Sequence, residues 1–174
     1  MLKNLFSIIL TTLFIAGAVL VIAVMVGMTL PETTEAARSA RFKARPAAVF
    51  SVISTIDRYP QWRSDVTRVE VLPDDGGGVL FKEYGRENVV TYRIEESEAP
   101  LHMRVRVADD SVPFGGSWTF VLQPFEDGTS LTITEEGTIG NPLYRVAAKV
   151  LFSATDSIDR YLSDLAAVAE LRGR

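Results

Sequence analysis

The chain lacks cysteine entirely and has a single histidine, His102, among its 174 residues. Without cysteine it can form no disulfide bond, no thiolate nucleophile and no lipoprotein anchor. One histidine and no cysteine leave a transition-metal site short of its usual ligands, and no motif for a serine triad is present. We therefore expect neither a metal site nor a cofactor.

His102 lies in an alternating segment with two distinct faces. Leu101 and Met103 share one face with other apolar residues, whereas His102 shares the other face with Arg104 and Arg106. Because the apolar face should meet the core, we expect His102 on the surface rather than in catalysis.

An excess of positive charge is also missing. The formal net charge is −4 at pH 7, and an acidic chain has no electrostatic footprint for nucleic acid. The glycine run Gly76–Gly78 is followed by no Lys-Ser or Lys-Thr pair and by no helix start, as a phosphate-binding loop would require. A hairpin turn after Pro73 is its simpler interpretation.

Charged residues are absent between Asn4 and Pro31. Within this segment, Leu5–Leu30 is an apolar run longer than the roughly 20 residues that a membrane helix needs. A secretory signal is the alternative, but its apolar region is shorter, roughly 7–15 residues, and the best cleavage site, Thr34-Glu35-Ala36, is poor. A buried core helix would need a polar face. We therefore predict an uncleaved, single-pass anchor over residues 1–31.

The side of the membrane on which the rest of the chain lies has two interpretations. More basic residues come after the apolar run, between Arg38 and Arg45, than the single Lys3 that precedes it, and a count of positive charges places the domain in the cytoplasm. A short basic N-terminus before a long apolar run is also typical of a signal anchor that exports the domain behind it. We favour an extracytoplasmic domain, because the later basic residues belong to a folded domain rather than to a free loop.

The remainder of the chain divides into a polar linker, residues 32–37, and one domain, residues 38–174. Arg38–Lys43 alternates between apolar and polar residues, which predicts a first strand. Pro46 then begins a short helix, because a proline in the first turn costs no hydrogen bond. That helix is broken before Pro60, and a second short helical turn is expected after it.

Six short alternating segments, separated by turns rich in Gly, Asp and Pro, predict an antiparallel meander. These segments are Val66–Leu72, Val79–Tyr84, Asn88–Glu96, Leu101–Ala108, Ser117–Pro124 and Ser130–Ile139. A long C-terminal helix then begins at Asn141 and Pro142, a good N-cap and a good first residue. Apolar residues recur along this helix at steps of three or four, from Leu143 to Val168.

Three parts of the chain resemble the polyketide cyclase/START-like superfamily, whose helix-grip fold is shared with the birch-pollen-allergen proteins. They are PAAVFSVISTIDRYPQWRSDV, the meander, and TITEEGTIGNPLYRVAAKVLFSATDSIDRYLSDLAA, within about Arg38–Leu171. The resemblance implies an α+β fold: a seven-stranded curved antiparallel sheet with two short helices and a long C-terminal helix, here preceded by one transmembrane helix. The family spans lipid carriers, hormone receptors, quinone binders and cyclases, so the resemblance bears more on fold than on function.

We expect a ligand cavity between the curved sheet and the C-terminal helix. Aromatic side chains with hydroxyl or indole groups suit an amphipathic ligand, and small side chains on the helix leave space against the sheet. The residues that we predict to contact a ligand are Trp62, Tyr84, Tyr92, Met103, Trp118, Phe120, Glu135, Val150, Ala154 and Ile158.

Glu135 is the candidate for a polar or catalytic role. Leu131 and Ile133 should face inward, and period-two alternation then places Glu135 on the inner face and Glu136 outside. A carboxylate near a cavity can hold a polar ligand group or perform acid–base chemistry. The alternative is that a strand end, or a bulge at Gly137, returns Glu135 to water.

Three functions remain open at this point. The leading hypothesis is a membrane-tethered binding or carrier domain, held by Leu5–Leu30, for a hydrophobic small molecule such as a lipid, a quinone or a polyketide-like compound. Such ligands partition into bilayers, and a tethered cavity could extract or present them. The second is a cyclase or hydrolase that uses Glu135 with a cavity tyrosine. The third is an interaction or stress-response module without a ligand.

Overall fold

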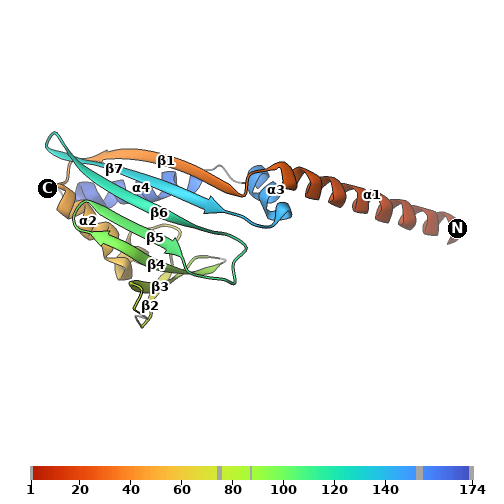
Figure 1. Cartoon of the computed structure of the whole chain (residues 1–174), viewed down its shortest axis with the longest axis horizontal. Coiled ribbons are helices and arrows are strands. Elements are labelled where there is room, and N and C mark those ends of the chain that lie inside the picture. The colour runs from red at the N-terminus through yellow and green to blue at the C-terminus, as the bar shows by residue number, and fades with distance from the viewer. Residues whose placement is uncertain (1, 74–75, 87, 152–154, 173–174) are drawn as a thin grey trace. The chain divides into compact units, whose positions relative to one another are not determined.

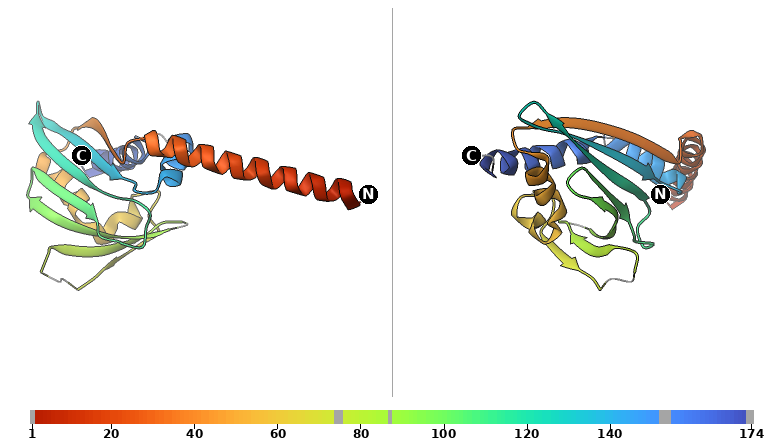
Figure 2. Two further views of the ribbon diagram at one scale, coloured as in Figure 1. Left: turned by 45° about the vertical axis from the view of Figure 1, so that its right-hand side comes forward. Right: turned by 60° about the vertical axis from the view of Figure 1, so that its left-hand side comes forward.

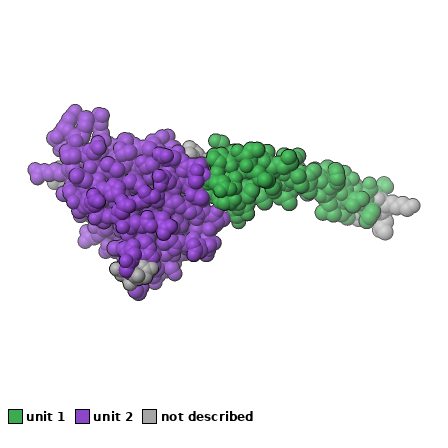
Figure 3. Space-filling model, viewed as in Figure 1, with its two compact units in different colours: residues 1–32, 139–153 green, residues 33–138, 154–174 purple. Residues whose placement is uncertain are grey.

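A computed structural model of the chain describes residues 2–73, 76–86, 88–151 and 155–172 (Figure 1). The chain forms two compact units (Figure 3). Residues 1–32 and 139–153 make up the first unit, and residues 33–138 and 154–174 make up the second.

The first unit contains two helices, α1 (Leu2–Thr29) and α3 (Pro142–Leu151). Helix α1 is uninterrupted (Figure 2), and most of its described apolar side chains are exposed. Within it, Phe6–Thr29 is long and apolar enough to cross a membrane, and it is the one such helix among the described residues. A signal sequence near the N-terminus can meet the same criterion of length and hydropathy.

The second unit is built on a seven-stranded antiparallel sheet, which confirms the predicted fold class. Its strand order is β1-β7-β6-β5-β4-β3-β2, so that the first strand pairs with the last. The strands are β1 (Thr33–Phe42), β2 (Arg68–Val71), β3 (Val79–Tyr84), β4 (Val89–Glu98), β5 (His102–Val107), β6 (Gly115–Phe125) and β7 (Gly128–Thr138).

Strand β1 begins earlier than the sequence suggested. Thr33 pairs with Thr138 and Ala37 pairs with Thr134, so most of the stretch assigned to a polar linker is part of the sheet. Polar side chains alternate with small ones there, and an edge strand tolerates this composition because one of its faces meets water. This observation corrects the expected linker over residues 32–37.

Three helices complete the second unit: α2 (Pro46–Ser54), the short 3₁₀ helix η1 (Ile56–Gln61) and α4 (Asp156–Arg172). As expected, Pro46 lies in the first turn of α2, which buries four apolar side chains in the core. Pro60 lies inside η1, so the second helical turn includes this proline instead of following it as the sequence suggested. The core fills the space between the sheet, α2 and α4.

The predicted long C-terminal helix is two helices in the structure, α3 and α4. Thr155 forms a turn before α4, and residues 152–154 lie outside the described part of the chain. The two helices belong to different units, because α3 packs against α1 whereas α4 packs against β1 and α2. The apolar stripe therefore does not form a single buried surface.

Candidate functional site

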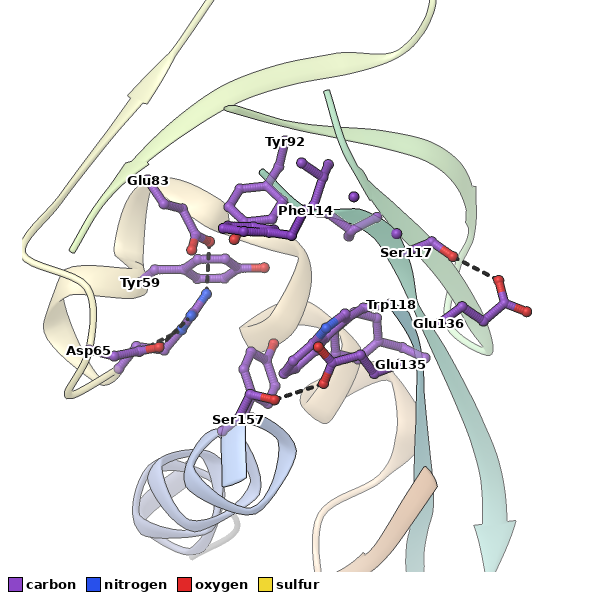
Figure 4. Close-up of a pocket in the computed structure, with 17 residues that line it drawn as sticks. Tyr59, Asp65, Glu83, Tyr92, Phe114, Ser117, Trp118, Glu135, Glu136 and Ser157 are labelled. Atoms are coloured by element: carbon purple, nitrogen blue, oxygen red, sulfur yellow. Dashed lines mark hydrogen bonds and ion pairs between the residues drawn. The ribbon is translucent and has the colours of Figure 1, made fainter. Parts of the chain in front are cut away.

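A cavity of about 190 Å³ lies within the second unit, between the sheet and α4 (Figure 4). Strands β3 to β7, the end of η1 with the residues just after it, and the first turns of α4 supply its walls. The cavity opens to solvent beside Phe114 and Ser157, which line it and are both exposed. It occupies the position expected from the sequence.

One wall of the cavity is aromatic. Trp118 and Phe120 project from β6, and their ring centroids lie 5.6 Å and 5.5 Å from that of Tyr161 on α4. Tyr92 on β4 stacks on Phe81, with centroids 5.7 Å apart. Rings at these distances form favourable pairs and a stiff apolar surface.

Next to these rings, the lining carries an ion-pair cluster centred on Arg63. Its guanidinium donates to both carboxylate oxygens of Asp65, at 3.1 Å and 2.9 Å, and to Glu83 at 2.7 Å. The guanidinium also lies over the rings of Tyr59 and Tyr161, at 5.1 Å and 5.2 Å from their centroids. Two carboxylates and two ring faces therefore compensate this charge for its loss of water.

Burial sets the protonation of these groups. It raises the pKa of Glu83, and the neighbouring Arg63 opposes that rise. Burial alone would lower the pKa of Arg63, but Glu83 and Asp65 more than offset it, so its pKa lies above the ordinary value. Burial also raises the pKa of Tyr92 and Tyr161. The guanidinium is thus charged, and the phenols remain neutral hydrogen-bond donors.

Two buried donors next to the cavity have no partner among the described residues. Tyr59 Oη donates to the carbonyl of Ile53 at 2.6 Å. Tyr161 Oη lies near that hydroxyl but forms no hydrogen bond of standard geometry, and neither does Trp62 Nε1. Tyr161 lines the cavity, although its hydroxyl oxygen is itself shielded from solvent.

Glu135 lies on the cavity side of β7, as period-two alternation indicated. Its Oε2 accepts a hydrogen bond of 2.7 Å from Ser157 Oγ on α4. The carboxylate of Glu136 points away from that of Glu135 (Figure 4) and accepts from Ser117 and Arg104, although Glu136 also contributes to the lining of the cavity. Glu135 is half-buried, and its part in binding or catalysis stays a prediction.

The structure brings together four of the ten residues predicted to contact a ligand: Tyr92, Trp118, Phe120 and Glu135 line the cavity. Trp62 lies beside it, packed edge-on against Tyr59 and Tyr161. Ala154 lies outside the described residues. The four others do not line the cavity: Met103 and Ile158 are fully buried in the core, Val150 is exposed on α3 in the first unit, and Tyr84 faces away on β3.

The prediction that Tyr84 contacts a ligand is also wrong. The same wrong assignment of the inner face of β3 explains why Glu83 was not identified. In β3, Phe81 faces the core and is 1% exposed. Alternation then directs Glu83 inward and Tyr84 outward, where Tyr84 Oη donates to Glu70 at 2.7 Å. Choosing Phe81 rather than Leu80 as the inward residue would have identified Glu83.

Sequence patterns also failed to identify Tyr59, Arg63 and Tyr161. A weak signal was present for Tyr161, which lies three positions, about one helical turn, after the predicted inward residue Ile158. No periodicity marks Arg63, because it lies in an irregular segment and its partners Asp65 and Glu83 come from different elements.

His102 is half-buried on β5, and its Nδ1 lies 3.7 Å from a carboxylate oxygen of Glu96. It does not line the cavity. Within the part of the chain that the structure describes, no group of three or more His, Asp or Glu residues is arranged to hold a metal ion.

Solved structures with this fold include enzymes and proteins of the START superfamily. Zhui aromatase/cyclase from Streptomyces sp. R1128 superposes with a TM-score of 0.68 at 14% identity, over 82% of this chain and 96% of that one. A START superfamily protein from Mycobacterium smegmatis gives 0.61 at 14% identity, over 79% and 98%. The di-domain ARO/CYC StfQ from the steffimycin pathway gives 0.65 at 13% identity, over 80% of this chain. The chain spans about half of StfQ, 51% of its length.

Identities this low establish the shared fold alone, and no curated protein matches the sequence. A family model provides the stronger relation. The model described as polyketide cyclase / dehydrase and lipid transport matches residues 33–170, which include the whole sheet, α2 and most of α4. The chain therefore belongs to the polyketide cyclase / dehydrase and lipid transport family.

Proposed function

We propose that the second unit binds an amphipathic small molecule in the cavity under α4, and that α1 tethers it to a membrane. The observation that carries the proposal is the pairing of an aromatic wall with buried polar groups in one cavity. Trp118, Phe120 and Tyr92 offer flat apolar surface, whereas Arg63 and Glu135 place polar groups in the same lining. Ligand sites combine these two features in this way.

The size of the cavity limits what it encloses. Pockets that bury a drug-sized ligand measure roughly 300–1,000 Å³, and this one measures about 190 Å³. It therefore holds one or two rings, or a segment of an acyl chain, while the rest of the ligand extends past Phe114 and Ser157. A quinone, a lipid or a polyketide-like aromatic compound fits this description, and the similarity to aromatase/cyclase structures favours a compound with rings.

The tether is the apolar helix Phe6–Thr29. With no charged residue in this span, insertion into lipid is favourable along its whole length. Ligands of the proposed kind concentrate in bilayers, and a domain held beside one exchanges them without crossing water. We place this domain on the extracytoplasmic side, in line with the signal-anchor interpretation of the N-terminus.

Filling the cavity tests the binding proposal. Val105 lines the cavity on β5, and Val105→Phe adds a ring to that space. Val89→Phe is the matched control, because Val89 is 44% exposed on β4 and does not line the cavity. Small molecules extracted from the purified full chain are identified by mass spectrometry, and affinities are measured for a panel of quinones, fatty acids and polycyclic aromatics.

We expect Val105→Phe to lose the extracted species and to weaken affinity at least about tenfold, a change of about 1.4 kcal/mol, while the control behaves as wild type. If no extracted compound distinguishes the wild type from Val105→Phe and no panel compound binds, the cavity is not a ligand site. The third hypothesis, an interaction module without a ligand, would then be favoured.

A second function, catalysis by Glu135, is favoured by one specific contact. The Ser157 hydrogen bond holds the Glu135 carboxylate at the edge of a cavity that also contains the neutral phenol of Tyr161. A carboxylate and a phenol can divide the base and acid roles of a cyclisation. Glu135→Gln keeps the shape of the side chain and removes the base. Loss of turnover with retained ligand affinity would identify an enzyme, and an effect on affinity alone would identify a binding protein.

A further inference from the structure

Helix α3 presents an apolar face that no described residue covers. Leu143, Tyr144, Val150 and Leu151 are 38%, 51%, 75% and 68% exposed. At 100° per residue these side chains share one side of the helix, and Arg145 projects from the opposite side. Four large apolar side chains exposed within ten residues form a surface that water disfavours.

The other side of α3 is fixed to the C-terminal end of α1. Gly27 is buried there, and an added Cβ would clash with the carbonyl oxygen of Pro142, so the close approach of the two backbones requires glycine at this position. Ala23 and Val24, on the same face of α1, are half-buried, whereas most other described positions of this helix are exposed. Within the first unit, α3 thus has a defined place on α1.

Arg145 supplies the polar part of this junction. Its guanidinium donates to the carbonyls of Gly27 and Leu30 at 3.1 Å and 2.9 Å, and it forms an ion pair of 2.7 Å with Glu32. It also donates to Ile139 and Gly140 in the segment that leads into α3. The last carbonyls of a helix have no partner within it, and a cation at that end is favoured. Arg145 therefore caps α1 while holding α3 in position.

The length of α1 determines the depth of this junction in a bilayer. The 24 residues of Phe6–Thr29 extend over about 36 Å at 1.5 Å per residue, and a hydrocarbon core is about 30 Å thick. The surplus of about 6 Å corresponds to roughly four residues. If α1 crosses a bilayer, the C-terminal end of this span, where α3 contacts Gly27 and Leu30, lies near the boundary between acyl chains and headgroups.

We infer that α3 is an interfacial helix, whose exposed face of Leu143, Tyr144, Val150 and Leu151 inserts into the same lipid bilayer that α1 crosses. This inference rests on the proposed tethering by α1. The inference is supported by the position of α3 within the first unit, because α3 is attached at the end of the exposed apolar surface of α1. The composition of α3 agrees: a tyrosine on the apolar face and Lys149 on the other side are typical of helices that lie in the interface.

The absence of cysteine from the sequence makes the test direct. Single cysteines are introduced into the full chain at Val150, at Val21 within the apolar span of α1, and at Glu126 in the exposed turn between β6 and β7. Each variant carries an environment-sensitive fluorophore and is reconstituted into vesicles of phosphatidylcholine and phosphatidylglycerol. Quenching by lipids with shallow or deep nitroxides, and by aqueous iodide, reports the depth of each label. Intrinsic tryptophan emission verifies that each variant is folded.

We expect the label of Val150→Cys to be quenched by shallow nitroxides and to be several-fold less accessible to iodide than that of Glu126→Cys. The Val21→Cys label should be quenched by deep nitroxides. Deep quenching at Val21 together with full iodide access at Val150 would overturn the interfacial helix and leave the tether intact. A Val150 label shielded from both iodide and nitroxide lipids would mean that protein covers this face, which also overturns the inference. Aqueous behaviour at both Val21 and Val150 would refute the tether and the inference together.

Discussion

Helices α3 and α4 carry the same kind of apolar pattern and bury it to very different extents. On α4, Ile158 and Leu165 are fully buried. On α3, Val150 and Leu151 are 75% and 68% exposed. The periodicity of apolar residues predicted one continuous helix with one buried face. The protein core buries the apolar residues of α4 but not those of α3.

The polar contacts of the two helices explain the difference. Helix α4 is joined to the sheet unit by the pairs Arg38–Asp159 and Glu135–Ser157 and by Asp164, which accepts from the backbone and side chain of Ser64. Helix α3 has instead Arg145, whose acceptors all lie within the first unit. The polar contacts of α4 hold its apolar side chains against the core of the second unit. Those of Arg145 hold α3 on α1, and the apolar side chains of α3 are then free to contact the lipid bilayer, as inferred above.

The largest expected effect comes from one substitution made on both helices. Leu165→Ala removes a fully buried side chain and should lower the free energy of unfolding of the sheet unit by about 2–5 kcal/mol. Leu151→Ala removes an exposed side chain and should change it by less than about 0.5 kcal/mol. Urea unfolding, monitored by the emission of the two tryptophans, measures both.

The same leucine-to-alanine change makes this a matched pair, because helix propensity is altered equally. Equal losses in the two variants would contradict the distinction between the helices. A large loss for Leu151→Ala alone would mean that α3 packs on the protein core in solution.

A smaller effect is expected from detaching α3. Arg145→Ala removes the side-chain donor of the Gly27 and Leu30 carbonyls, which should destabilise the junction by about 2 kcal/mol. Amide hydrogen exchange along α3 should then accelerate roughly thirtyfold, while the urea midpoint of the sheet unit stays constant. Lys149→Ala is the control, because Lys149 is exposed on the same helix. Similar exchange in the two variants would exclude Arg145 as the anchor.

Much of the fold could be predicted because its signals are local. Alternation located all six strands of the meander, Pro46 marked the start of α2, and the charge-free N-terminus marked α1. The division into α3 and α4 could not be predicted, because the stripe from Leu143 onward is the same whether the sheet or another surface covers it. Contacts between α3 and the end of α1, such as those of Arg145 with residues over 100 positions away in sequence, distinguish these outcomes.

The residues of the site likewise include some that could be predicted from the sequence and some that could not. Trp118, Phe120 and Glu135 could be placed by alternation in long strands with clear inner faces. In the six-residue β3 the inner face was ambiguous between Leu80 and Phe81, and the ambiguity reversed the roles of Glu83 and Tyr84. Period-two patterns determine a face only where several residues agree.

The smallest effect at neutral pH, and a clear one at high pH, is expected from Tyr161→Phe on α4. Tyr161 Oη has no hydrogen-bond partner of standard geometry among the described residues, so its removal leaves no group unsatisfied and should cost less than about 1 kcal/mol at neutral pH. Burial raises the pKa of this phenol well above its ordinary value. The folded chain therefore keeps the proton above about pH 10, where the unfolded chain loses it.

Since the folded state binds more protons in that range, stability is fully present below about pH 10 and falls as the pH rises beyond it. The phenylalanine variant has no proton to lose in either state. Its free energy of unfolding should fall less steeply, by up to about 1.4 kcal/mol per pH unit, the contribution of one proton. Urea unfolding at a series of pH values measures the slope. Tyr144→Phe, which removes the same hydroxyl from the exposed face of α3, is the control. Equal slopes for the wild type and Tyr161→Phe would show that water reaches this phenol, and that α4 is covered no better than α3.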